Sequence, residues 1–273
     1  MPELPEVETI KNQLNQKIKN ATIIKVRYSD VIGSIIKQEF PSLIGKKISH
    51  FERHCKVLLV FLDKTHVIQS GLGMSGSWRI WDKITNVPHT HMTIECKLKN
   101  KKNIYLAYVD PRRFGKMHYF SLEEWKEKKQ KMGVDVSGPN FTIEYLEYCL
   151  KKYPDRMIKP YLLDQKFFGG IGNYIACEIC ARAGIKPQRR CKNIRKYEYP
   201  KILEATRSVL EGQIKRNGLT FSGGYSDTTG EKGNGIQDLV VFHQEICGLC
   251  HQKTIKKINL SQRGTYYCKE CQK

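Results

Sequence analysis

Acidic residues are scarce in this sequence of 273 residues, where 27 Asp and Glu accompany 47 Lys and Arg, a formal charge of +20. No stretch approaches the roughly 18 consecutive apolar residues of a membrane span. The acidic opening MPELPEVE lacks the apolar core of a signal peptide. Basic amphipathic helices and lipidation motifs are also missing, which disfavours a membrane partner. We therefore expect an intracellular protein, and nothing in the sequence calls for an oligomer.

The excess of positive charge favours a polyanionic partner, for which nucleic acid is the simplest choice. The content of 40% apolar and 27% charged residues is that of an ordinary globular chain, with one large domain or two. Two Lys-rich runs, 97–103 and 125–131, are predicted to form a hairpin turn and the solvated face of a helix. Charge runs of this kind commonly lie in solvent.

The first 120 residues combine one helical pattern with many strand patterns. Val7, Ile10, Leu14 and Ile18 recur at helical spacing, which predicts an amphipathic helix over 5–19. Short strand-like runs follow, separated by Gly, Asn, Pro or Lys turns, and they predict an antiparallel sandwich or barrel. These runs are 22–28, 47–53, 56–62, 66–71, 76–81, 91–98, 103–109 and 116–120.

Beyond residue 132 the pattern changes to helices. The segment 132–140 loses periodicity and contains Gly and Pro, so it is predicted to be a linker. A four-helix domain is expected over about 141–217, with Gly184 and Gly218 ending two of its helices. A glycine-rich stretch follows over 218–235, and long loops of this type are commonly functional. It is not a P-loop, because Glu231 separates Gly230 from Lys232.

Ten cysteines in a chain without a signal peptide indicate reduced thiols rather than a disulfide framework. Four of them form two close pairs, Cys247/Cys250 and Cys268/Cys271, separated by 17 residues. This spacing is typical of a structural zinc site, in which four thiolates leave no open position for chemistry. The basic insert between the pairs suggests a ribbon that contacts DNA. The other six cysteines are predicted to pack in the core.

Six motifs, in this order and over the whole chain, resemble those of formamidopyrimidine-DNA glycosylase. Read alone, the opening is a helix start with Pro5 and two favourable acidic residues, and no other single motif is decisive. Together the six make an accidental match implausible. They are MPELPEVET, GLGMSG (71–76), DPRRFG (110–115), IKPYLLDQ (158–165), GGIGNYIACE (169–178) and the terminal SQRGTYYCKECQK.

The resemblance implies an α+β protein that binds damaged double-stranded DNA. It consists of an N-terminal β-sandwich with flanking helices, a helical helix-two-turn-helix domain and a C-terminal zinc ribbon with one structural zinc ion. The implied parts are a catalytic domain over 1–131, the linker 132–140, the helix-two-turn-helix domain over 141–217, a lesion-capping loop over 218–238 and the ribbon over 239–273.

The resemblance also implies a catalytic role for the amino terminus. In the family the initiator Met is removed and the exposed proline amine is the nucleophile, which here is the nitrogen of Pro2. Glu3 matches the family's general acid/base, and Glu6 matches a second carboxylate near the site. The enzyme would excise the base and then cleave the DNA by β,δ-elimination.

Further residues match family positions that hold DNA. Met74, Arg112 and Phe114 match residues that fill the gap left by an extruded base. Four others match family positions that contact phosphates around the lesion: Lys56, Lys159, Asn173 and Arg263. Two of these, Lys56 and Arg263, are also expected to belong to the catalytic set with Pro2 and Glu3.

The chain departs from the family pattern at three places. Gly71 stands where relatives often have His, the insert between the cysteine pairs is about one residue longer, and the 218–238 loop differs. We expect a glycosylase/lyase for oxidised purines such as 8-oxoguanine and formamidopyrimidines. Two alternatives stay open: an endonuclease VIII-like glycosylase for oxidised pyrimidines, and a non-catalytic zinc-ribbon protein that binds DNA.

Overall fold

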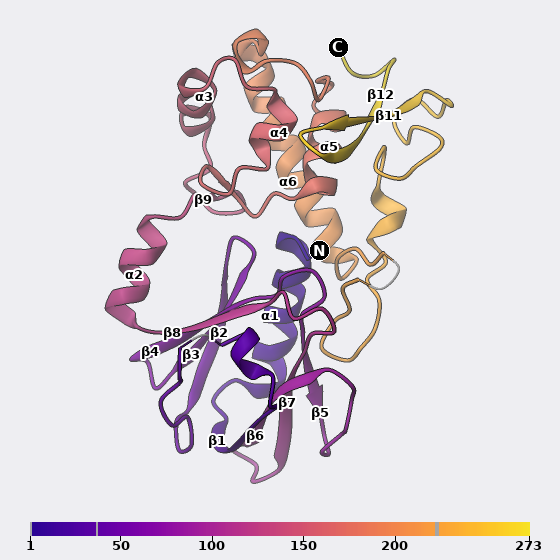
Figure 1. Ribbon diagram of the computed structural model, residues 1–273. Helices are drawn as coiled ribbons and strands as arrows, with labels where there is room; N and C mark the ends of the chain where they lie inside the picture. The colour runs from indigo at the N-terminus through magenta and orange to yellow at the C-terminus, as the bar shows by residue number, and fades with distance from the viewer. Residues whose placement is uncertain (1, 37, 222–223) are drawn as a thin grey trace. The chain divides into compact units, whose positions relative to one another are not determined.

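The computed structural model describes residues 2–36, 38–221 and 224–273, and the chain divides into two compact units. The first unit contains Met1–Gln130 and Arg216–Asn234, and the second contains Lys131–Lys215 and Gly235–Lys273. Each unit is shown in Figure 1, where the sheets of the first unit are indigo to magenta. Among the described residues, no helix combines the length and apolar character needed to cross a membrane.

The first unit is built on two antiparallel four-stranded sheets (Figure 1). One sheet has the order β1-β6-β7-β5 and the other the order β2-β3-β4-β8. The strands are β1 Thr22–Tyr28, β2 Ile48–His54, β3 Val57–Leu62, β4 His66–Gly71, β5 Ser77–Trp81, β6 Thr90–Lys97, β7 Asn103–Val109 and β8 Lys116–Ser121. All eight lie within a residue or two of their predicted bounds, which confirms the sandwich.

The described residues of this unit form two α-helices. Helix α1, Leu4–Ile18, packs against β2 and buries its predicted apolar stripe in the core between the sheets. Helix α2, Leu122–Gln130, buries only Trp125, as expected for a solvated Lys-rich helix. The short 3-10 helix η1, Ile32–Ser34, completes the unit's regular elements before residue 131.

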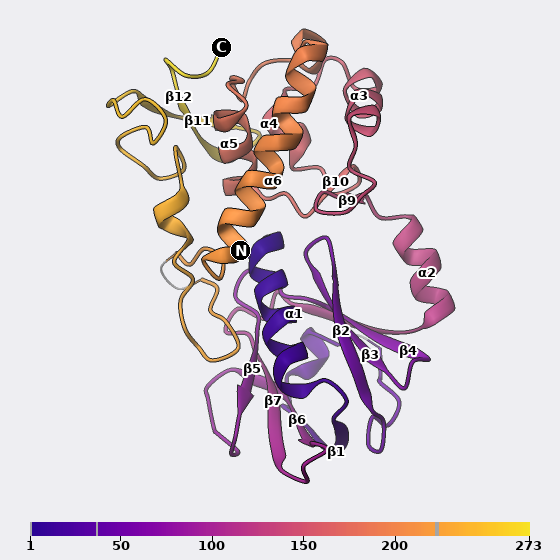
Figure 2. The ribbon, with the colours of Figure 1, turned by 180° about the vertical axis from the view of Figure 1, so that it is seen from behind.

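The second unit is mainly helical, with α5 and α6 packed side by side (Figure 2). Its helices are α3 Ile143–Lys152, α4 Ile158–Leu162, α5 Asn173–Arg182 and α6 Tyr199–Lys215, with the 3-10 helices η2 Cys191–Asn193, η3 Lys196–Glu198 and η4 Gly235–Asp238. Its strands are β9 Val134–Asp135 paired with β10 Phe168–Gly169, and β11 Ile255–Leu260 paired with β12 Arg263–Cys268. Strand β12 packs against α5.

Three segments differ in detail from their expected outlines. Part of the segment 132–140 is the short strand β9, which pairs in parallel with β10. The helix expected from residue 194 begins only at Tyr199, because Pro200 removes a backbone donor and is tolerated only in a first turn. The segment 218–238 is divided, since residues up to Asn234 belong to the first unit and η4 to the second.

Candidate active site and nucleic-acid interface

The start of α1 carries the predicted catalytic residues of the amino terminus. Pro2 precedes the helix, Glu3 is its N-cap residue and Glu6 lies in its first turn. The Oε2 atom of Glu6 accepts the backbone N–H of Glu3 at 2.6 Å. Only 4% of Glu3 and 1% of Glu6 is exposed. The backbone next to Pro2 is therefore held in place by a buried carboxylate.

The second oxygen of Glu6 binds the beginning of the glycine-rich segment. Its Oε1 atom accepts the backbone N–H of Leu219 at 2.7 Å. Gly218 has a left-handed backbone (φ +79°), and a Cβ placed there would lie 2.8 Å from the Glu6 carboxylate. Helix α6 already ends at Lys215, and Asn217 is left-handed as well. The close approach of Glu6, rather than helix termination alone, therefore explains glycine at 218.

The following residues of this segment dock on α1 and β5. Gln13 of α1 donates to Asp227 Oδ2 at 2.8 Å and accepts the backbone N–H of Thr228 at 3.0 Å. Arg79 of β5 donates to the Asp227 carbonyl and to the Ser226 hydroxyl. Burial opposes ionisation of Asp227, but the hydrogen bonds from Gln13 and Thr229 outweigh it and lower the pKa. The described part of the predicted capping loop is thus anchored to the helix that begins next to Pro2.

The three predicted gap-filling residues lie on two loops that are bonded to each other. Met74 and Phe114 are 38% and 51% exposed, and the Arg112 guanidinium lies 4.8 Å from the centre of the Phe114 ring. Ser75 joins the loops, because its hydroxyl donates to Asp110 Oδ1 at 2.6 Å and accepts the Arg112 N–H at 3.2 Å. The structure therefore brings Met74, Arg112 and Phe114 together on one exposed edge of the first unit.

Asp110 organises these loops, a role that the sequence did not reveal. Its carboxylate is fully buried and accepts the N–H of Gly115 at 2.8 Å, in addition to the Ser75 hydroxyl. The glycines permit this packing, since a Cβ at Gly73 would lie 2.5 Å from the Phe114 backbone, and one at Gly115 would lie 1.7 Å from the Tyr108 hydroxyl. An Asp-Pro turn signals a loop but does not predict such a buried contact.

Lys56 lies in the turn between β2 and β3. The preceding residue, Cys55, has a left-handed backbone with φ 55°. Its carbonyl accepts a hydrogen bond from Arg53 at 3.0 Å, and Arg53 Nε also binds Glu8 Oε2 of α1 at 2.8 Å. Helix α1 is thus tied to the hairpin that presents Lys56, through an ion pair that no spacing in the sequence indicates.

The second unit contains the other three predicted phosphate contacts. Lys159 of α4 is fully buried, and its Nζ atom lies 2.6 Å from Oδ1 of Asn173. The Nδ2 atom of Asn173, at the start of α5, donates to the carbonyl of Gly264 at 3.0 Å. Gly264 follows Arg263, whose side chain is exposed at the start of β12. These three residues therefore belong to one hydrogen-bonded region.

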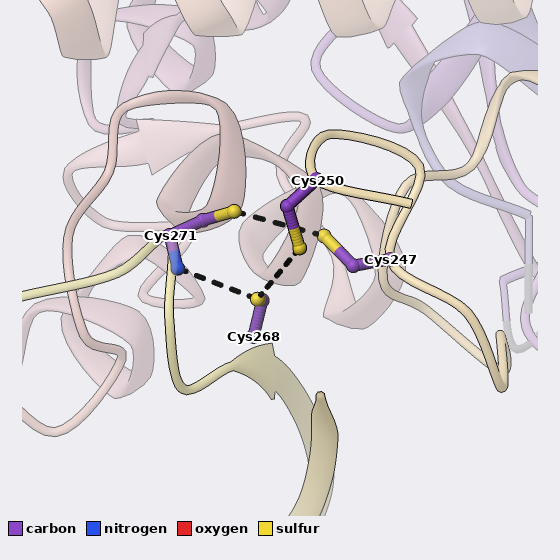
Figure 3. Close-up of side chains that lie close together, drawn as sticks. All are labelled: Cys247, Cys250, Cys268 and Cys271. Carbon is purple, nitrogen blue, oxygen red and sulfur yellow. Dashed lines mark hydrogen bonds between the residues drawn. The ribbon is translucent and has the colours of Figure 1, made fainter. Parts of the chain in front are cut away.

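The four predicted metal ligands form one cluster, shown in Figure 3. The sulfur atoms of Cys247, Cys250, Cys268 and Cys271 all lie within 4.8 Å of one another. The pairs Cys247/Cys271 and Cys250/Cys268 are separated by 3.9 and 3.8 Å. Four sulfurs at the Zn–S distance of about 2.3 Å would be about 3.8 Å apart at the corners of a tetrahedron. The residues present therefore fit a tetrahedral metal ion.

Hydrogen bonds lower the pKa of two of the four cysteines, Cys250 and Cys268, and so favour the thiolate, the form that binds metals. Burial opposes ionisation of Cys268, but the Thr254 hydroxyl at 2.9 Å and the backbone N–H groups of Cys271 and Glu270 lower its pKa to about 6. Burial and the neighbouring thiols raise the pKa of Cys271. Four thiolates this close together would repel one another, and a bound cation would offset that repulsion. The remaining six cysteines are buried as predicted.

Comparison with known families and sequences agrees with this architecture. The model of the formamidopyrimidine-DNA glycosylase N-terminal domain matches residues 1–117, and the model of the family's H2TH domain matches residues 132–223. A formamidopyrimidine-DNA glycosylase of Oceanobacillus iheyensis is 36% identical over all of this chain and 98% of its own length. One from Ureaplasma parvum is 34% identical over the full length of both chains.

Solved structures of similar proteins extend the agreement to three dimensions. The LlFpg protein in complex with THF-DNA and an inhibitor has a TM-score of 0.89, at 27% identity and full coverage of both chains. A complex of the Lactococcus lactis Fpg with abasic-site DNA has a TM-score of 0.87 at the same identity and coverage. With both halves of the chain matched by family models, this protein belongs to the formamidopyrimidine-DNA glycosylase family of DNA base-excision repair enzymes.

Proposed function

We propose that this protein excises oxidised purines from damaged double-stranded DNA and then cleaves the strand, with the nitrogen of Pro2 as nucleophile. The observation that carries the proposal is the buried carboxylate of Glu6, which fixes the residue after Pro2 and also binds the glycine-rich segment. Once Met1 is removed, Pro2 has a free α-amine. An α-amine titrates closer to neutral pH than a lysine ammonium, so more of it is unprotonated and able to act as a nucleophile.

The reaction begins with attack of the Pro2 nitrogen on C1′ of the damaged nucleoside. The bond from C1′ to the base breaks and its electron pair leaves with the base, which takes up the proton that the attacking secondary amine loses. Glu3 donates a proton to the ring oxygen as the sugar opens, which leaves a positively charged iminium on the secondary amine. The Glu3 carboxylate, which has given up its proton, accepts a proton from C2′, and the iminium becomes an enamine. The enamine electrons expel the 3′ phosphate and restore a conjugated iminium, and a second elimination expels the 5′ phosphate.

The DNA is held by residues of both units. Met74, Arg112 and Phe114 fill the space of the extruded base, since Met and Phe are suitable wedges and Arg can donate to the orphaned partner base. Lys56, Asn173 and Arg263 bind phosphates, which position the duplex without reading its sequence. The segment 218–238, of which residues 222 and 223 lie outside the described residues, is the lesion-capping loop in this proposal. Its docking through Gln13 and Arg79 supports this assignment.

The metal of the cysteine cluster is zinc in this proposal. A site of four cysteine sulfurs is typical of structural zinc and leaves no coordination position for a water molecule or a substrate. The ion would therefore stabilise the ribbon that presents Arg263. The insert of 17 residues between Cys250 and Cys268 contains β11 and all of β12 except its last residue, which is the ligand Cys268 itself.

A second candidate substrate is DNA with oxidised pyrimidines, because a Lactococcus lactis relative was solved with DNA containing one. Base release from duplexes that each carry one lesion separates the two. We expect faster release of 8-oxoguanine and formamidopyrimidines than of thymine glycol, and the reverse order would favour the pyrimidine assignment. The Pro2→Gly variant should retain DNA binding but lose most base removal, and full activity would refute the nucleophile.

A further inference from the structure

Lys159 lies inside a chain of hydrogen bonds that joins three elements of the second unit. Its ammonium group binds Asn173 Oδ1 at 2.6 Å, and Asn173 Nδ2 binds the Gly264 carbonyl at 3.0 Å. Helix α4 is thereby linked to the first residue of α5 and to strand β12 beside Arg263.

Lys159 is more deeply buried than the other two residues of this hydrogen-bonded region. None of its surface is exposed, whereas Asn173 is partly exposed and Arg263 is exposed. A phosphate oxygen must come within about 3 Å of a donor to form a hydrogen bond, and a covered ammonium does not allow that approach. A buried charge also requires hydrogen-bond partners in place of water, and the Asn173 carbonyl oxygen is one of them.

The chemistry of the pair determines how the Asn173 amide is oriented. Lysine offers only donors, so it selects the oxygen of the Asn173 side chain. The amide nitrogen must then point the other way, toward Gly264, whose carbonyl can only accept. An amide nitrogen has two hydrogens, so one can bind Gly264 while the other binds a phosphate.

We propose that Lys159 is a positioning residue, which orients Asn173 and through it the turn that presents Arg263, and that it does not bind a DNA phosphate itself. This inference rests on the proposed function, because it assumes that Asn173 and Arg263 bind DNA. The resemblance implied that Lys159 contacts a phosphate, and the inference replaces that role. The roles proposed for the other residues are unchanged.

Lysine acetylation of the full-length wild-type protein tests the burial directly. The protein is treated with N-hydroxysuccinimidyl acetate, with and without a duplex containing a tetrahydrofuran abasic analogue, and modified sites are measured by mass spectrometry. We expect Lys159 to react at least about tenfold more slowly than exposed Lys166 in both states. Reaction of Lys159 at the rate of Lys166, with protection by DNA, would overturn the proposal.

A double-mutant cycle tests the positioning role through affinity for the same duplex. Lys159→Met keeps the aliphatic stem and removes the ammonium group, and it should weaken binding about tenfold, as expected for loss of a charged hydrogen bond. In the Asn173→Ala background the same change should have less than a twofold effect, because Lys159 acts through the Asn173 amide and residues that act together are not additive. Equal effects in both backgrounds would overturn the proposal.

Controls separate this inference from the proposed function. Lys166→Met removes an exposed lysine of the same unit and should leave affinity within about twofold of wild type. If the wild-type protein does not bind the duplex, the proposed function fails. The acetylation of DNA-free protein still tests whether Lys159 is buried, and it needs no variant to fold.

Discussion

Single residues near the amino terminus show how tightly the site is built. Glu6 has one oxygen on the Glu3 backbone and the other on the Leu219 backbone, two residues separated by more than 200 positions in sequence. The resemblance predicted that the Glu6 carboxylate lies near the site, but it did not predict which two backbone N–H groups donate hydrogen bonds to it. Such long-range contacts leave no periodic pattern in a sequence, so they could not be predicted from it.

Gly218→Ala should destabilise the protein and lower activity. The new Cβ would meet a strained backbone and lie 2.8 Å from the Glu6 carboxylate, and we expect a loss of about 1 to 3 kcal/mol in the free energy of unfolding. Gly45→Ala is the matched control, since Gly45 is also left-handed but has open space around its Cβ position. If the two variants unfold alike, the contact with Glu6 is unimportant for stability.

The Glu8–Arg53 ion pair should make stability depend on pH. Burial opposes ionisation of Glu8, but hydrogen bonds from Lys11 and Arg53 outweigh it and lower the pKa below its ordinary value of 4.5. Because the pKa of Glu8 is lower in the folded than in the unfolded protein, its ionised form stabilises the fold at any pH above the unfolded-state pKa. This stabilisation is lost as the pH falls through the folded-state pKa.

Thermal unfolding of the wild type and Glu8→Gln over pH 3 to 7 measures this effect. We expect the variant to be less stable at neutral pH and the two proteins to converge at low pH. A stability difference that stays constant over this range would contradict the assigned ion pair.

The bounds of helices and strands were predicted better than the contacts of single residues. Strands such as β1, β4 and β7 match their predicted bounds because short runs rich in β-branched and aromatic residues are separated by turn residues. The two-residue strands β9 and β10 were not predicted, since two residues are too few for any period. The late start of α6 follows from Pro200, a local rule that could have been applied.

The cysteine ribbon is an element whose fold should depend on metal. Cys268→Ser should release the metal ion, which we propose to be zinc, unfold the β11–β12 hairpin and weaken DNA binding by about tenfold or more, because Arg263 loses its support. Metal content and affinity for a lesion duplex check this. Cys191→Ser, at a buried cysteine outside the cluster, should keep one zinc ion per chain. Unchanged DNA binding by zinc-free Cys268→Ser would show that the ribbon is dispensable.

At the scale of the whole molecule, the charge of +20 indicated a polyanionic partner. The motifs indicated a family of enzymes whose polyanionic partner is DNA. The predicted residues fall into both units: the nucleophile and the gap-filling residues in the first, and Asn173, Arg263 and the metal site in the second. The sequence could assign these residues only through resemblance. Their supporting contacts, such as those of Asp110 and Gln13, required the structure.

Adduct trapping tests the central claim most directly. Protein whose intact mass shows that Met1 has been removed is mixed with duplexes carrying 8-oxoguanine, a formamidopyrimidine or an oxidised pyrimidine, and sodium borohydride is added. We expect a stable protein–DNA product whose cross-link maps to the peptide beginning at Pro2. If protein with a free Pro2 forms no cross-link with any of these lesions, covalent catalysis by its amino terminus is contradicted.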